Sequence, residues 1–178
     1  MAIIDITTVK QFGRIDTSLH DDLLQKIIDS VISFTERYCD IKLSSASYEE
    51  RLHAEGGALF PSNKPITAVE KVEDAWNSDT EVTEDLFYTN TQIRFNEGYT
   101  WAPGEYRWKT FYTAGYTDST APDGLVDAML QLCIRCYNNP DLRKAAREVK
   151  TNNIEYRILK DSDALAKLDQ FSMKRFMD

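Results

Sequence analysis

The chain has 178 residues, of which 42% are hydrophobic and 28% charged. This is the composition of one folded domain with room for a subdomain, and it excludes a disordered protein. The sequence has no apolar run of about 18 residues and no signal peptide at its start, so we expect a protein made and kept in a cytoplasm, without a membrane span.

The net charge of −8 is concentrated in the middle of the chain. Residues 46–121 carry thirteen Asp and Glu against six Lys and Arg, whereas residues 122–178 carry nine against ten. An acidic section argues against binding DNA through its phosphates. It indicates a surface that releases nucleic acid or one that meets a basic partner. A solvated acidic face that keeps the protein soluble explains the same charges.

The first 43 residues predict two helices. Residues 6–14 form a short one, capped by Thr7 or Thr8 and ended by Gly13. After a polar loop, residues 19–39 carry a wide apolar stripe at helical spacing. A stripe of this width indicates packing on more than one neighbour, either within the chain or partly in a subunit interface.

Residues 44–112 change to a period near two and are richer in Gly, Pro, Asn and aromatic residues. We expect a small antiparallel sheet with one buried face. Gly56-Gly57 is a hairpin signal, and the strand before Tyr116 ends in a turn where Gly115 needs a positive φ. The expected strands lie near 46–54, 68–75, 86–95 and 105–113.

The last third predicts helices again. Residues 122–138 form the second strong helix, with Pro122 at its start and Pro140 beyond its end. A shorter basic helix over 141–149 follows, and residues 151–160 read as either a strand or a loop. The tail, 162–177, is amphipathic, with Ser162 or Asp163 as its cap. It either completes the core or lies in a partner's groove.

The fold class expected from these elements is α+β: a bundle of two long and several shorter helices, packed with a small antiparallel sheet or hairpin section. We interpret residues 1–178 as one domain. Its sections are N-terminal helices at 1–43, a β-rich section at 44–116, helices at 117–150 and a C-terminal extension at 151–178. The candidate partner-binding residues lie on the tail helix: Leu165, Leu168, Phe171, Met173, Arg175 and Phe176.

No motif of an enzyme or a nucleotide site occurs in the sequence, and we expect neither catalysis nor a cofactor. Cys133 and Cys136 form a C-x-x-C inside an apolar helical pattern, which favours structural cysteines over a metal site. His20 is expected to be exposed in a first helical turn, and His53 to lie in a strand. The carboxylate pairs at 49–50, 73–74 and 84–85 are adjacent, and neighbours on a strand point to opposite faces.

Four aromatic residues suggest an alternative function. Trp76, Trp101, Tyr106 and Trp108 could stack on sugars, as in a carbohydrate-binding or tail-associated recognition module. A sheet core with aromatic residues in its loops explains the same set. Glycan binding that is lost when the tryptophans are changed would favour the module.

Three segments, taken in order, resemble the head-tail connector (adaptor) proteins of tailed bacteriophages. The first is the short helix, Arg14-Ile15-Asp16 and the helix beginning D-D-L-L-Q-K-I-I-D-S; the second is P-I-T-A-V with Val72. The third is Y-T-A-G-Y at 112–116, followed by Pro122 and the helix to Tyr137. The long β section and the roughly 40 residues after the second main helix depart from the shortest members of that family.

The resemblance implies a virion structural protein at the neck. The family forms a ring of about 12 copies under the portal protein, and such a ring needs two different faces of each subunit to fit. The ring extends the DNA channel, through which DNA passes without specific binding, and offers a docking surface for a stopper or tail. The terminal helix would then bind the portal, and no membrane is involved.

Overall fold

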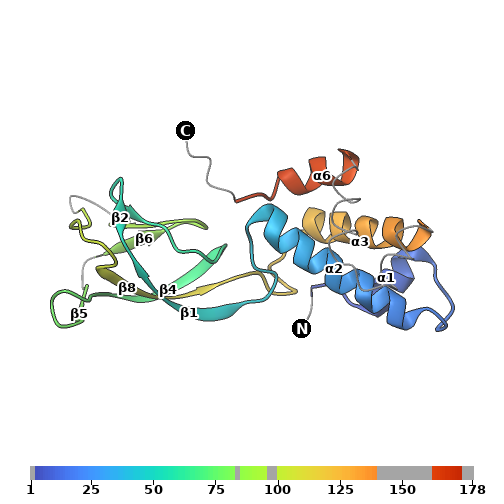
Figure 1. Cartoon of the computed structure of the whole chain (residues 1–178), viewed down its shortest axis with the longest axis horizontal. Helices are drawn as coiled ribbons and strands as arrows, with labels where there is room; N and C mark the ends of the chain where they lie inside the picture. Colours follow the sequence, from blue (N-terminus) through green and yellow to red (C-terminus); the bar gives the residue numbers. More distant parts are fainter. Residues whose placement is uncertain (1–2, 83–84, 96–99, 140–161, 174–178) are drawn as a thin grey trace. The chain divides into compact units, whose positions relative to one another are not determined.

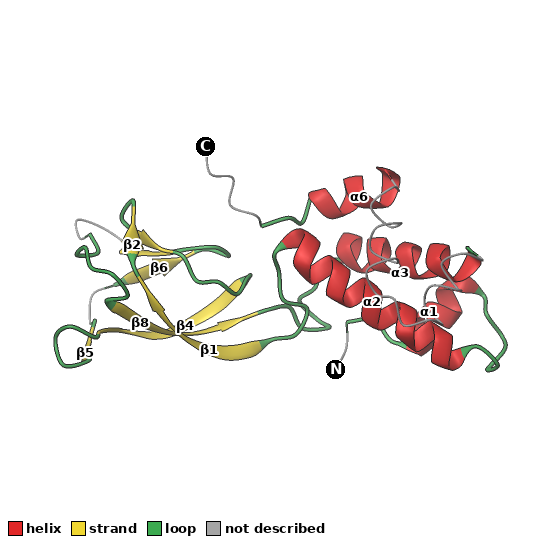
Figure 2. Ribbon diagram, viewed as in Figure 1, coloured by secondary structure: helices red, strands yellow, loops and turns green. Residues whose placement is uncertain are grey.

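The computed structural model describes residues 3–82, 85–95, 100–139 and 162–173. The chain divides into two compact units, a helical one from Met1–Leu43 with Thr117–Asp178 and a β unit from Ser44–Tyr116 (Figure 1). Helices and antiparallel sheets are both present (Figure 2), so the α+β class is confirmed. The predicted helix at 141–149 and the ambiguous segment at 151–160 lie outside the described residues.

The helical unit is built on α2 (Asp21–Cys39) and α3 (Asp123–Asn138), with the shorter α1 (Ile6–Gly13) and α6 (Ser162–Asp169) beside them. The wide apolar stripe of α2 is buried because α1, α3 and α6 each pack against this helix. Fully buried side chains of this core include Val9, Leu24, Ile27, Ile28, Leu125, Met129, Leu132 and Leu168.

The start of α1 corrects the predicted cap. Asp5 is the capping residue, and its carboxylate accepts from the backbone N–H of Thr8 at 2.7 Å. Neither Thr7 nor Thr8 serves, since both already lie within the helix. The end at Gly13 is as predicted, but the left-handed residue is Arg14, at φ 51°. Gly13 has another role, because a Cβ there would lie 2.2 Å from Cδ1 of Ile134 on α3.

The other helix boundaries follow the sequence signals closely. Helix α2 begins at Asp21, two residues later than expected. It ends at Cys39, and the next residue, Asp40, has the left-handed backbone conformation. Pro122 precedes α3, and α3 ends at Asn138, before Pro140. The tail helix is shorter than the predicted 162–177: α6 ends at Asp169, and a turn follows it.

The β unit contains two four-stranded antiparallel sheets rather than one small sheet. The first has the order β1-β8-β4-β5, and its centre is β8 (Trp108–Ala114), which pairs along its full length with β1 (Ala46–Leu52) and β4 (Ile66–Asp74). The second has the order β2-β3-β7-β6. The remaining strands are β2 (Ala54–Glu55), β3 (Ala58–Leu59), β5 (Thr80–Glu81), β6 (Leu86–Tyr88) and β7 (Ile93–Phe95).

Three of the four predicted strands are present with shifted ends, and the fourth is two strands. The segment predicted at 86–95 is a hairpin, because Thr89 N–H donates to the carbonyl of Gln92 and turns the chain between β6 and β7. Gly56 and Gly57 form the predicted β2–β3 turn, both at positive φ. Residues 105–107 precede β8 instead of belonging to it.

Alternation along β8 separates a buried face from a half-exposed one. Trp108, Thr110, Tyr112 and Ala114 are buried, whereas Lys109, Phe111 and Thr113 are partly exposed. The buried side faces an aromatic and aliphatic core shared with the second sheet, which includes Leu59, Ile66, Val72, Ile93 and Trp101. The end of β8 confirms the predicted turn, since Gly115 has φ 105°.

Candidate partner-binding surfaces

The tail helix α6 is held against the end of α2 by three contacts. Tyr38 donates to the carboxylate of Asp169 at 2.6 Å, and Cys39 Sγ lies 3.4 Å from the carbonyl oxygen of Leu168. Just beyond the helix, the backbone N–H of Met173 donates to the carbonyl of Cys39 at 2.7 Å. Both ends of the segment 168–173 are therefore fixed to α2.

Helix α6 also contacts α3. Lys167 Nζ lies 3.2 Å from Asp127 Oδ2 and 3.0 Å from Gln131 Oε1. The ring of Phe171 lies against Gly124, where a Cβ would come within 3.0 Å of its Cζ. The tail is thus packed into the helical unit on two sides, which is the arrangement expected of a helix that completes a core.

The six candidate residues of the tail fall into three groups. Leu168 is fully buried in the helical unit. Leu165, Phe171 and Met173 are half-buried, so each keeps an accessible part. Arg175 and Phe176 lie outside the described residues. The helical spacing of apolar residues predicted this set. It could not show which side of the tail helix is covered by the rest of the chain and which side stays accessible. Their role in partner binding stays a prediction.

All three cysteines are buried in the helical unit as free thiols. Cys133 and Cys136 are both buried on α3, and Cys39 is buried on α2. Burial raises the pKa of Cys133, and it raises the pKa of Cys136 to about 12. Their thiols are therefore protonated at neutral pH and poor metal ligands or nucleophiles. Among the described residues, no group of three His, Cys, Asp or Glu side chains is placed to hold a metal ion.

The two histidines differ from expectation. His20 is half-buried rather than exposed, and its Nδ1 lies 2.7 Å from the hydroxyl of Tyr137 on α3. His53 falls between β1 and β2, exposed, with Nε2 3.9 Å from Glu55. The two rings lie in different units.

The carboxylate pairs are used to hold the β unit together. Glu73 accepts from Lys71 at 2.6 Å, and this bond is the main cause of its lowered pKa. Asp74 accepts from Arg107, which lowers the pKa of that carboxyl. A lowered pKa keeps a carboxylate ionised, whereas a general acid needs a raised one. Glu50 accepts from the backbone and side chain of the loop at 62–63, and Glu84 lies outside the described residues.

The aromatic set proposed for sugar stacking is divided by the fold. Trp101 and Trp108 are buried, and their indole N–H groups donate to the carbonyls of Ile93 and Ala102. Trp76 and Tyr106 are 63% and 59% exposed. Two of the three tryptophans of the carbohydrate-binding alternative are therefore core residues, because the second sheet covers them. This observation removes most of the stacking platform.

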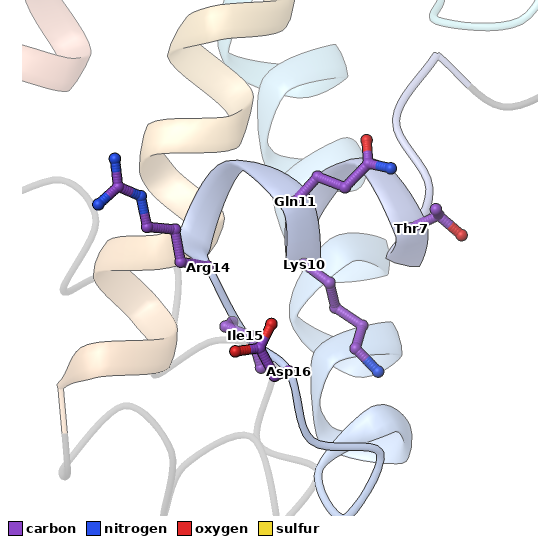
Figure 3. A pocket seen from close by; sticks show the side chains of 6 residues that line it. All are labelled: Thr7, Lys10, Gln11, Arg14, Ile15 and Asp16. Carbon is purple, nitrogen blue, oxygen red and sulfur yellow. The ribbon is translucent and has the colours of Figure 1, made fainter.

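A surface hollow lies at the end of α1, and the Arg14-Ile15-Asp16 motif forms one of its sides (Figure 3). Thr7, Lys10 and Gln11 of α1 line the rest. Lys10 is paired with Asp21 of α2 at 2.8 Å, so its charge is already balanced. The lining side chains include neither a histidine nor a cysteine.

Comparison with protein families decides the class of the chain. Residues 3–100 match the model of the phage gp6-like head-tail connector proteins. The chain belongs to this family. The matched residues contain the short helix, the Arg14-Ile15-Asp16 motif, α2 and most of the β unit, which includes two of the three segments that carried the resemblance.

Solved structures of neck and virion assemblies share the fold of this connector. A chain in the neck of an empty gene transfer agent particle computed with C6 symmetry has TM-score 0.62 at 15% identity, over 98% of this chain and 92% of that one. A chain in the virion of the native gene transfer agent particle has TM-score 0.57 at 18% identity, over 78% of this chain and 79% of that one. A third chain, in the neck of the native particle computed with C12 symmetry, has TM-score 0.52 at 20% identity, over 74% of this chain and 76% of that one. No curated protein sequence matches.

The chain is thus a head-tail connector protein. None of the described helices is both long enough and apolar enough to cross a bilayer. The candidate partner-binding surfaces are the accessible part of the tail and the exposed residues of the β unit.

Proposed function

We propose that this connector assembles into a closed ring of about 12 copies that attaches below the portal protein and carries the stopper or tail on its other side. Membership of the head-tail connector family is the observation that carries the proposal. Chains of the same fold occur in necks computed with C6 and C12 symmetry. A cyclic ring is the simplest way for one chain to join two symmetric assemblies.

The charge of the β unit supports a passage for DNA without specific binding. The segment from residue 44 to residue 116 has twelve acidic residues against six basic ones. Of the basic ones, Lys71, Arg107 and Lys109 are ion-paired with carboxylates. An acidic surface repels phosphate and does not retain DNA. The ring would extend the channel by excluding contacts with DNA and would have no catalytic role or cofactor.

The tail supplies a contact to the portal in this proposal. Leu168 holds the helix in place from inside the helical unit, whereas Leu165, Phe171 and Met173 present their accessible parts to the partner, together with Arg175 and Phe176. The two units would act as one connector domain over residues 1–178.

Quantitative mass spectrometry of purified particles tests the ring. We expect a ratio of this chain to the portal protein of about one to one, as two stacked rings of equal or similar copy number require. Absence of the chain from the particles would overturn the proposal. A ratio far below one would also contradict it, since a ring cannot be closed with a few copies.

A truncation after Met173 tests the tail separately. It removes residues 174–178 and keeps the hydrogen bonds described above between α6 with its following turn and helices α2 and α3. We expect an unchanged melting temperature and at least a tenfold loss of incorporation into particles, which corresponds to about 1.4 kcal/mol of binding free energy. Normal incorporation would show that Arg175 and Phe176 do not bind the partner.

A further inference from the structure

Two exposed aromatic residues mark one end of the β unit. Trp76 is 63% exposed in the β4–β5 connection, and Tyr106 is 59% exposed just before β8. Their segments are joined by a backbone hydrogen bond from Ala75 to the carbonyl of Arg107 at 2.9 Å. We refer to Trp76 and Tyr106 as the aromatic tip. Tryptophan and tyrosine are enriched in protein interfaces relative to the rest of the surface.

A buried carboxylate, that of Asp74, orders the Trp76 part of the aromatic tip. Asp74 accepts from Arg107 Nε at 2.9 Å and Nη2 at 2.5 Å, and also from the backbone N–H of Trp76 at 3.1 Å. The guanidinium lies between two indole rings, 5.6 Å from the centre of Trp76 and 5.0 Å from that of Trp108. The Trp76 backbone and the guanidinium beside its ring are therefore held by Asp74, and groups ordered before binding lose less entropy on binding.

Tyr106 is held in a costly conformation. Its φ is 50°, in the left-handed region that bulky residues avoid. Its ring meets His53 edge-on at 6.4 Å and otherwise extends into solvent. Strained residues of this kind collect at functional sites, where the exposed side chain is needed in one position. Burial in the monomer does not explain the strain, since most of the ring is accessible.

The rim of the aromatic tip is acidic. Asp79, Glu81 and Glu105 are exposed in the same two segments, 74–81 and 103–107. Arg107 is the only cation in those segments, and Asp74 neutralises it. The aromatic tip therefore combines exposed aromatic side chains with exposed carboxylates, and its complement is an apolar pocket bordered by lysine or arginine.

We infer that the aromatic tip is a docking surface for another protein of the neck, one that presents an apolar pocket edged by lysine or arginine side chains. The inference rests on the proposed function, since it names a partner within the same assembly. Two copies of the tip would oppose like charges, which argues against a symmetric contact between copies. A sugar is disfavoured because one tryptophan alone is exposed and the Asp74 carboxylate is already bound to Arg107 and Trp76.

Photo-crosslinking in purified particles identifies the occupant. Trp76 is replaced by benzoylphenylalanine, which keeps an aromatic side chain at the position, and the crosslinked peptides are sequenced. We expect a crosslink to a different virion protein, in a peptide that contains lysine or arginine. A crosslink to a second copy of this chain would overturn the inference, and so would the absence of any crosslink in particles that contain the chain.

Matched variants measure the contribution of the tip. Trp76→Ala and Glu105→Lys are compared with Phe87→Ala, a 51% exposed aromatic residue of the same unit outside the tip. We expect at least a tenfold fall in complete, tail-bearing particles for the first two and no change for Phe87→Ala. Melting temperatures of the purified variants exclude misfolding. Equal yields for all three variants would overturn the inference, whereas absence of even the wild-type chain from particles would instead overturn the proposed function.

Discussion

Tyr38 donates a 2.6 Å hydrogen bond to Asp169, a residue 131 positions further along the chain. The bond joins the last turn of α2 to the last residue of α6 and fixes the end of the tail helix. It is the polar part of a contact whose apolar part is Leu168, and both parts can be tested.

The Tyr38–Asp169 bond makes stability depend on alkaline pH. The hydrogen bond to Asp169 is the main cause that raises the pKa of Tyr38 to about 12 in the folded chain. The unfolded value is about 10, so the folded state binds this proton more tightly. Its contribution is complete below about pH 10 and is lost as the pH rises from about 10 to 12. Denaturant unfolding across this range should show a smaller alkaline loss in Tyr38→Phe than in the wild type; identical losses would contradict the assignment.

Leu168 and Leu165 form a matched pair on the tail. Leu168→Ala should destabilise the helical unit by about 2–4 kcal/mol, because a fully buried leucine leaves a cavity. Leu165→Ala should cost about 1 kcal/mol or less, since the side chain is half-buried. Denaturant unfolding of both variants measures the difference. Equal effects would mean that α6 does not pack by its Leu168 side.

Gly13 and Ile134 form a close contact between α1 and α3. Gly13→Ala should destabilise the protein by no more than about 1 kcal/mol. The new Cβ would lie 2.2 Å from Ile134 Cδ1, but that atom ends a half-buried side chain that can shift, and alanine favours a helix. Ile134→Val removes that methyl group, and the double variant should recover part of the loss. Thermal melting of the two single variants and the double variant measures the coupling. Strict additivity would contradict the contact.

Gly115 combines a positive φ with a close backbone neighbour. Gly115→Ala should destabilise the β unit by about 2–4 kcal/mol, because φ is 105° and the Cβ would lie 2.2 Å from the carbonyl oxygen of Ser44. Gly57→Ala is the control: its φ is 77° but its Cβ would meet nothing within 4 Å, so about 1 kcal/mol is expected from strain alone. Equal melting temperatures for the two variants would show that the Ser44 contact is unimportant.

Several elements could be predicted because their signals are local. The stripe of α2, the Pro122 start of α3 and the Gly56-Gly57 turn depend on residues close in sequence, and all three are present. The cap of α1 was missed because Thr7 and Thr8 are also good capping residues, and only the geometry selects Asp5. The segment predicted as one strand at 86–95 is a hairpin. The prediction missed its turn because the turn residues include no glycine or proline.

The candidate surfaces were predictable only in part. The apolar period of the tail identified Leu168 and Leu165 together, but their burial differs because α2 and α3 cover one side of the helix. In the same way, Trp76 and Trp108 are both tryptophans in an aromatic section, yet one is a surface residue and the other a core residue. Residue type gives the apolar area, and it does not say which neighbours cover that area.

The sequence by itself determined the class of elements, the acidic middle section and, through three short motifs in order, the connector family. These properties depend on local spacing and composition, which a linear chain displays in full. The tertiary structure decided which apolar residues are free, because Asp74 and Arg107, or Tyr38 and Asp169, meet only when the chain folds. Contacts between distant residues set the exposure of Trp76 and Leu165, and exposure decides which surfaces a partner can reach.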